Sequence, residues 1–173
     1  LNRLSFMEQF NDVFKLDFAG VKEFSNRAKS FFQKKDSSSV DLEEIKEIKS
    51  LIRKREAQSA YRYCGVDDEN AFFLDLPFYK TGKPQKNPIS SLDIQKTKKL
   101  LKEVAPHQIF VAGDKSDPHG THKICLDIVK RSLIELRDEK EDFINDCWVW
   151  QYRGAGVEWP IGEIEMAVPL SPE

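Results

Sequence analysis

The sequence has 173 residues, 40% of them hydrophobic and 12 of them Phe, which is enough to bury the core of a soluble globular domain. Its 27 Lys and Arg nearly balance its 29 Asp and Glu, so the formal net charge is −2. A chain with so little net charge has no overall field that attracts nucleic acid or an anionic membrane, and the composition therefore predicts neither partner.

Two further features bear on the compartment. No apolar run approaches the ~18 residues of a membrane span, and no signal-peptide pattern opens the sequence. Cys64, Cys125 and Cys147 are odd in number, lie far apart and form no C-x-x-C motif, which favours buried thiols in a reducing compartment. The sequence predicts a cytoplasmic protein and leaves oligomerisation open.

The first part of the chain predicts a helical lead-in segment over residues 1–40. Residues 3–14 and 20–35 place Phe, Met and Val at helical spacings among polar residues, as amphipathic helices do. The polar stretch 34–41 has no periodicity, so it predicts a loop.

The longest helix candidate spans residues 41–65. Asp41 is its expected N-cap, Glu43 and Glu44 would lie in the first turn, and Gly65 would end it. One apolar stripe runs along this helix and comprises Leu42, Ile45, Ile48 and Ile52.

Helices and short apolar runs alternate through the rest of the chain. We expect helices at 92–104, capped by Ser91, and from about Pro118 to Glu139. The run 108–113 is continuous in apolar residues, as a strand covered on both faces would be. The apolar runs 71–76, 108–113, 147–154 and 163–170 predict strands near 72–76, 108–112, 147–152 and 164–169 that belong to one sheet. This order predicts an α/β, Rossmann-like layered fold with a mainly parallel sheet flanked by helices.

Both ends of the sequence predict that this α/β domain, over residues 41–173, is incomplete. The sequence opens with Leu1 rather than Met. It closes with Ser171, Pro172 and Glu173, which are the start signature of a helix that does not follow. We therefore expect a piece of a longer chain that covers apolar surface exposed here.

The stretch SDPHGTH, residues 116–122, contains two of the three histidines. It follows the expected strand at 108–113 and opens a helix, which is where open parallel α/β sheets bind ligands. With Asp117 as N-cap, His119 and His122 would lie at i and i+3 on one helix face, roughly 5–6 Å apart at Cβ. A helix N-terminus favours the neutral imidazole that a metal requires. Because H-x-x-H is a pattern of low specificity, two ordinary exposed histidines are the alternative.

Four stretches of the sequence resemble one known family. GDKSDPHGTH (113–122) resembles the second conserved motif, H-P-D-H, of the zinc-dependent de-N-acetylases known as the LmbE-like or PIG-L-like family. IRKREAQSAYRYCGV and FLDLPFY (52–66 and 73–79) resemble that family's R-x-x-E-A helix and the strand end that follows it. WQYRGAGVEWPIGEIEMAVPLS (150–171) resembles the closing region of a subgroup fused behind a glucosamine-6-phosphate deaminase-like domain.

The resemblance implies roles for individual residues. His122 matches the histidine that ligates zinc, and His119 matches the one that acts as electrophile or general acid beside the scissile amide. Arg53 and Glu56 match the R-x-x-E pair, for which the resemblance suggests a substrate-lining role, as it does for Asp117. The alternative for Arg53 and Glu56 is a simple ion pair on a helix surface.

The sequence departs from the family pattern in two ways. Gly120 and Thr121 stand between the two histidines, so the role of the motif's central Asp does not carry over. The family's first motif, A-H-P-D-D, supplies the other zinc ligands and the aspartate that activates water, and it would have to precede Leu1 because these residues contain no HPD. A catalytic zinc needs three protein ligands. We therefore expect Zn²⁺ in the intact domain and little or none in this chain alone, which should be inactive by itself.

The sequence thus predicts part of a zinc-dependent hydrolase domain that de-N-acylates an amino sugar or related small molecule, in a glucosamine-6-phosphate deaminase-related protein. An alternative is a non-catalytic sugar-binding or regulatory module attached to a sugar-phosphate deaminase. A third, a metal-free scaffold or dimerisation domain, is favoured if His119 and His122 face solvent. Trp148, Trp150 and Trp159 with Tyr152 could line a sugar pocket, but residues 148, 150 and 152 alternate as one face of a strand does, and we interpret them as core residues.

Overall fold

The computed structural model divides the chain into two compact units, Leu1–Phe73 and Leu74–Glu173, and each is described by itself. The sequence-based division into residues 1–40 and 41–173 stays a prediction. The residues that the structure describes are 14–15, 18–36, 39–80, 86–113, 120–153 and 159–168.

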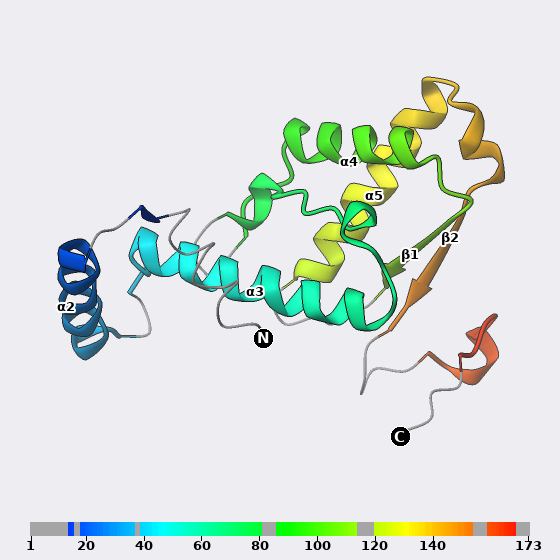
Figure 1. Cartoon of the computed structure of the whole chain (residues 1–173). Coiled ribbons are helices and arrows are strands. Elements are labelled where there is room, and N and C mark those ends of the chain that lie inside the picture. The colour runs from blue at the N-terminus through cyan, green and yellow to red at the C-terminus, as the bar shows by residue number, and fades with distance from the viewer. Residues whose placement is uncertain are drawn as a thin grey trace. The chain divides into compact units, whose positions relative to one another are not determined.

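The first unit contains two long helices, α2 (Phe18–Lys34) and α3 (Glu43–Tyr63) (Figure 1). They confirm the helices predicted at 20–35 and 41–65. The helix predicted at 3–14 lies almost entirely outside the described residues. No helix in the described ranges is long and apolar enough to cross a lipid bilayer.

The start of α3 differs from the prediction. The N-cap is Leu42, which makes no side-chain cap bond, so the expected cap at Asp41 is wrong. The Asp41 carboxylate instead accepts hydrogen bonds from the ammonium groups of Lys35, at 2.5 Å, and Lys49. These two bonds lower the pKa of Asp41. The carboxylate therefore joins the preceding loop to the first turns of α3 rather than binding the N–H groups of the helix.

The end of α3 is as the sequence predicts. Gly65 has φ +79°, the left-handed conformation that favours glycine. The backbone N–H of Gly65 donates to the Arg62 carbonyl at 3.0 Å, and the N–H of Val66 donates to the Tyr61 carbonyl at 2.9 Å. This pair of bonds is a Schellman motif, which satisfies two carbonyls that the helix end leaves without partners.

The second unit is built around a β-α-β crossover. Helix α4 (Ser91–Val104) precedes strand β1 (Gln108–Ala112), and helix α5 (Thr121–Asp138) connects β1 to strand β2 (Trp148–Tyr152). The two strands are parallel, with Gln108 opposite Trp148 and Ala112 opposite Tyr152. They run side by side in Figure 1, and α5 contacts both α4 and β1. The observed fold is thus mixed helix and strand, with a small parallel sheet.

Two predicted strands are absent from this sheet. Within the described residues, only β1 and β2 form strands. Residues 71–76 have no regular hydrogen bonding, with Asp75 at φ +46°, and Pro77–Tyr79 forms a 3-10 helix. The described part of 163–170 likewise contains no strand and follows a 3-10 helix at Ile161–Glu163. A short apolar run indicates that its residues are buried, but it does not by itself establish a strand. A strand also needs a neighbouring strand that supplies its hydrogen-bond partners.

The sheet is also covered less than predicted. Val111, on one face of β1, is buried, whereas on the opposite face Ala112 is buried but Phe110 is 56% exposed. The prediction that the strand at 108–113 is covered on both faces is therefore wrong. Helix α5 packs against β1, and the face that carries Phe110 lacks a comparable cover in the described residues.

The core of the second unit lies where α4, α5 and the segment before α4 meet. Its buried members are Phe78, Ile94 and Ile128, joined by partly buried Leu76, Ile89, Ile124 and Cys125. The N-cap of α4 is Ser90, one residue before the predicted Ser91, and it forms a capping box with Asp93. The apolar run at 71–76 thus contributes Leu76 to the core rather than a strand to the sheet.

Candidate functional site

His122 lies in the first turn of α5, just beyond the C-terminal end of β1 in the chain. Its side chain is exposed. The position is the one predicted from the order of strand, loop and helix, because β1 and β2 are parallel and α5 is the crossover between them. An exposed imidazole is compatible with a metal ligand whose co-ligands come from other segments. It is equally compatible with the alternative of a metal-free scaffold.

The helix itself starts later than the sequence suggested. Helix α5 begins at Thr121, and its N-cap is Gly120 with φ +66° and no side-chain cap bond. Helix α5 therefore starts three residues after the predicted start at Pro118, whereas the predicted cap at Asp117 and the predicted placement of His119 and His122 on one helix face stay predictions. Glycine at the left-handed position delays the helix because it turns the backbone there without steric cost. Asp117 and His119 lie outside the described residues.

Arg53 and Glu56 lie on α3 in the first unit and form an ion pair at 3.1 Å. Their side chains are 83% and 49% exposed. This is the surface ion pair that was the alternative to a substrate-lining role, and such pairs contribute little to stability. The structure brings together two of the five site residues inferred from the sequence, namely this pair. The pair lies in the first unit, which is described separately from the second unit and its His122.

A second set of residues lies at the C-terminal ends of the strands, and of these the sequence pointed only to Trp159, as an alternative sugar-pocket residue. Arg153 directly follows β2, and its guanidinium carbon lies 3.8 Å from the ring centroid of Trp159. The Trp159 indole N–H donates to the Gln151 carbonyl at 3.2 Å. Gly113 directly follows β1, and its N–H donates to the Tyr152 carbonyl at 2.7 Å. The available signal was the position of Arg153 immediately after a parallel strand.

Gly113 is required by the close approach of these side chains. A Cβ built at this residue would lie 2.8 Å from the Gln151 Cβ and 3.2 Å from the Trp159 Cζ2. Both distances are shorter than ordinary van der Waals contacts, so any larger residue would displace the indole or the strand. The Trp159 ring is thus wedged between Gly113, Gln151 and the Arg153 guanidinium.

An aromatic row, Phe110, Trp148 and Trp150, occupies one face of the two strands. The ring centroids of Phe110 and Trp150 lie 6.4 Å apart, as do those of Trp148 and Trp150. Trp148 is 68% exposed and Tyr152, on the same face of β2, is 53% exposed. The interpretation of Trp148 and Tyr152 as core residues is therefore wrong for this structure.

The described His, Cys, Asp and Glu side chains are the residues that could bind zinc. Across the described ranges, no group of three His, Cys, Asp or Glu side chains is placed to hold a metal ion. The described residues therefore do not form a zinc site by themselves, and His122 is the single member of the predicted ligand set among them.

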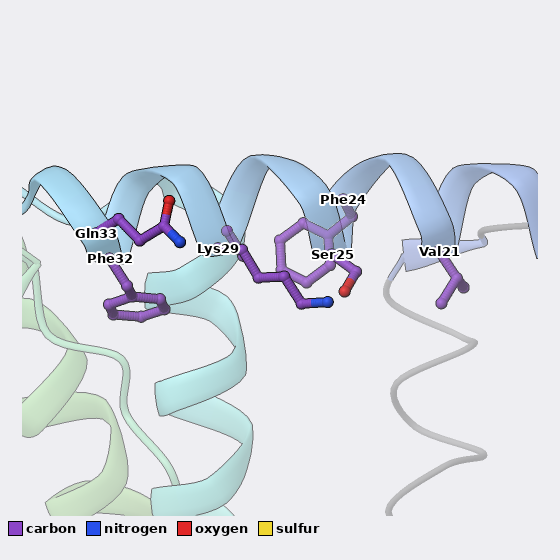
Figure 2. A pocket seen from close by; sticks show the side chains of 7 residues that line it. Val21, Phe24, Ser25, Lys29, Phe32 and Gln33 are labelled. Carbon is purple, nitrogen blue, oxygen red and sulfur yellow. The ribbon is translucent and has the colours of Figure 1, made fainter.

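A shallow pocket lies along α2 in the first unit. It is lined by Val21, Phe24, Ser25, Ala28, Lys29, Phe32 and Gln33, all from this one helix. Figure 2 shows these side chains in a row along α2, with Lys29 between Phe32 and Phe24 and with Val21 farther along the helix. The lining contains no carboxylate, histidine or cysteine, so the groove offers an apolar surface and no acid–base or metal chemistry.

A cluster of ion pairs in the second unit joins two helices. Glu139, just after α5, accepts hydrogen bonds from Lys102, at 2.8 Å, and from Lys98 on α4. These two bonds lower the pKa of the Glu139 carboxyl. The cluster holds the C-terminal ends of α4 and α5 together, far along α5 from His122.

The comparisons with known proteins found one relationship that bears on function. No protein-family profile matches the chain, and no solved structure matches it either. The chain is similar to a glucosamine-6-phosphate deaminase-like protein of Bacteroides thetaiotaomicron, with 44% identity over 171 residues. The match covers 98% of the chain and 26% of the relative, so the chain spans about a quarter of that relative's length. The resemblance to de-N-acetylases rests on sequence motifs alone.

Proposed function

We propose that this chain is part of a hydrolase domain that removes the acyl group from an N-acyl amino sugar or a related small molecule. The observation that carries the proposal is the position of His122, at the start of the crossover helix between two parallel strands. The 44% identity to a protein named after an amino-sugar phosphate enzyme supports the substrate class. The de-N-acetylase motifs supply the reaction type.

The proposal assigns two different tasks to the two histidines. His122 would be a zinc ligand, and His119 would donate a hydrogen bond or a proton beside the scissile amide. Because the described residues contain no second and third ligand for His122, these ligands would have to come from outside the described part of the 173 residues. The metal would supply an activated water when bound.

The experiment compares metal content and turnover. Zinc per chain is measured by elemental analysis in the 173-residue protein and in a longer form that includes the preceding polypeptide of its gene, alongside hydrolysis of N-acetylglucosamine derivatives. We expect near-stoichiometric zinc and turnover in the longer form only. His122→Ala should lower the zinc content, whereas His119→Ala should spare zinc and slow hydrolysis.

His107→Ala is the matched control, because His107 is exposed and precedes β1, at the opposite end of the strand. It should change neither zinc content nor turnover. Equal zinc in the longer wild-type form and in its His122→Ala variant would exclude the ligand role of His122.

A non-catalytic sugar-binding module is the second candidate, and the aromatic row favours it. The rings of Phe110, Trp148 and Trp150 are partly exposed on one sheet face, and aromatic rings offer apolar faces on which the C–H groups of a pyranose can pack. Binding of N-acetylglucosamine that is lost in Trp148→Ser, together with no hydrolysis in the longer form, would favour this module over the hydrolase.

A further inference from the structure

The pocket along α2, called the α2 groove below, is an apolar surface on a single helix. Its apolar lining residues are Val21, Phe24, Ala28 and Phe32, which are three or four residues apart and so lie on one face of the helix. Val21 is 40% exposed and Phe32 is 51% exposed. The described residues therefore cover this face only in part, and transfer of the face into an apolar environment would be favourable.

Basic residues border the apolar face on both sides. Lys22 and Lys29 are seven residues apart and lie on one side of it, and Arg27 and Lys34 are seven residues apart and lie on the other. Helix α2 contains these four basic residues and one acidic residue, Glu23. The small net charge of the whole chain predicted no anionic partner, but that average does not describe a helix whose positive charge borders an apolar face.

Three of these four basic side chains have no acidic partner among the described residues. Arg27 forms an ion pair with Glu44. Lys22, Lys29 and Lys34 are exposed and form no ion pair within the described part of the chain. The helix therefore offers three ammonium groups, together with its apolar face, to an anionic partner.

We propose that α2 binds an anionic lipid surface, with its apolar face between the lipid headgroups and its lysines at headgroup level. Amphipathic helices bind bilayers in this way when Lys and Arg stand beside a face that carries Phe. The long lysine stems pack along apolar surface while their ammonium groups reach the headgroup phosphates. The helix lies along the surface and does not cross it. This inference goes beyond the proposed function and does not depend on it.

The lining of the groove favours a lipid surface over a protein partner. All of the lining residues come from α2, so within the described residues no second element forms an opposite wall. A partner helix that binds in a groove needs such walls for its apolar residues. Lipid chains are fluid and adapt to the face of one helix, and Figure 2 shows the side chains in a row along that face.

The experiment measures vesicle binding. The 173-residue protein is mixed with vesicles of phosphatidylcholine, or of equal parts phosphatidylcholine and phosphatidylglycerol, and the bound fraction is measured by co-sedimentation. We expect the anionic vesicles to bind more tightly by on the order of 10- to 100-fold, because each lysine near an anionic surface adds attraction. Binding should weaken when NaCl rises from about 0.1 to about 0.5 M, since salt screens exposed charges. Hydrogen exchange should slow in residues 18–34 on anionic vesicles and stay unchanged in α4.

One pair of double variants tests the charges. Lys22→Gln combined with Lys29→Gln should weaken binding to the anionic vesicles by roughly 10-fold. Lys99→Gln combined with Lys130→Gln is the control, because it removes two exposed lysines from α4 and α5 and changes the net charge equally. The control should bind as the wild type does.

A second pair of variants tests the apolar face. Phe32→Ser should weaken binding to the anionic vesicles, because it removes apolar surface that the lipid would bury. Phe72→Ser is its control, since Phe72 is 49% exposed and lies outside α2. Circular dichroism and thermal unfolding without lipid establish that each variant is folded.

The outcomes decide between a lipid surface and other occupants of the groove. No binding to either vesicle, equal binding to both, or unchanged binding in the folded variant that lacks Lys22 and Lys29 would each overturn the proposal. Self-association that Phe32→Ser abolishes in sedimentation velocity without lipid would assign the groove to a second copy of the chain instead. Vesicle binding by the 173-residue protein but not by the longer form would show that the whole protein covers α2, which also rejects the proposal.

Discussion

The carboxylate of Asp93 accepts a hydrogen bond from the backbone N–H of Phe78, at 3.1 Å, and so joins the start of α4 to the core of the second unit. The same carboxylate accepts from the Ser90 N–H, at 2.8 Å, and from the Ser90 hydroxyl, at 2.6 Å. Asp93 is fully buried. One side chain thus caps a helix and fixes the 3-10 turn that carries Phe78.

Removing this carboxylate should destabilise the fold markedly. We expect Asp93→Ala to lower the free energy of unfolding by about 2–3 kcal/mol, because it leaves the buried Phe78 N–H and the partly buried Ser90 N–H without an acceptor and breaks the capping box. Asp93→Asn keeps one acceptor oxygen and should cost less. Urea unfolding measures both, with exposed Glu103→Ala on α4 as the control, expected within about 0.5 kcal/mol of wild type. A similar effect of Asp93→Ala and Glu103→Ala would contradict the anchoring role.

The same carboxylate should make stability depend on pH. Burial acts to raise the pKa of Asp93, but the hydrogen bonds from Ser90 and from the Phe78 N–H outweigh it, so its pKa lies below the ordinary value. A lowered folded pKa means that the stabilisation is complete above the unfolded pKa, about 3.9, and is lost as the pH falls through the folded pKa. The stability difference between wild type and Asp93→Asn should therefore be constant from pH 7 to 5 and shrink below pH ~4. A difference that grows on acidification would refute the sign.

Gly113 should tolerate no side chain. We expect Gly113→Ala to cost about 1–3 kcal/mol of unfolding free energy, since its Cβ would lie 2.8 Å from the Gln151 Cβ and would displace Trp159. Gly162→Ala is the matched control, because nothing lies within 4 Å of a Cβ built there. Thermal unfolding compares the two variants, and Trp fluorescence reports the displaced indole in Gly113→Ala. Equal stability of both would show that the strand ends are loosely packed.

Lys140 offers a stabilising substitution. It follows α5 with φ +61°, and its N–H donates to the Arg137 carbonyl at 2.9 Å, so it holds the left-handed position of a helix-ending motif. A lysine is strained in this conformation and a glycine is not, so Lys140→Gly should raise stability by about 0.5–1 kcal/mol. Lys130→Gly, exposed in the middle of α5, should instead lower stability by about 1 kcal/mol. Chemical denaturation of both variants tests the opposite signs.

The ion pair of Arg53 and Glu56 distinguishes a surface contact from a substrate contact. Because both side chains are largely exposed, Arg53→Ala should change the unfolding free energy by no more than about 0.5 kcal/mol. Turnover of N-acetylglucosamine derivatives by the longer form should also be unchanged if the pair is only structural. A loss of turnover without a loss of stability would restore the substrate-lining role suggested by the family resemblance.

Local sequence predicts the helices of this protein. The apolar spacing of 20–35 and 41–65, and Gly65 at the end of α3, predict elements that the structure contains. The spacing of Ser90 and Asp93, three residues apart, also fits a capping box, but the sequence-based prediction placed the N-cap at Ser91. Helices are predictable because their hydrogen bonds join residues four apart, so a short stretch of sequence carries most of the information.

Which apolar runs form strands, and which strand faces are buried, depends on partner segments that local sequence does not specify. The apolar runs at 71–76 and 108–113 look alike, yet only the second lies beside another strand. The alternation of Trp148, Trp150 and Tyr152 predicted that they share a face, but the packing of α5 on β1 decided that other residues of the sheet are covered.

The candidate site divides in the same way. The sequence by itself identified His122 and placed it after a strand and at the start of a helix, because both elements and their order are local features. Only the tertiary structure stacked Arg153 on Trp159 and pressed the indole against Gly113, which directly follows the other strand, β1. Such contacts arise when parallel strands are brought into register by a crossover helix, and this long-range pairing determines which side chains meet at the strand ends.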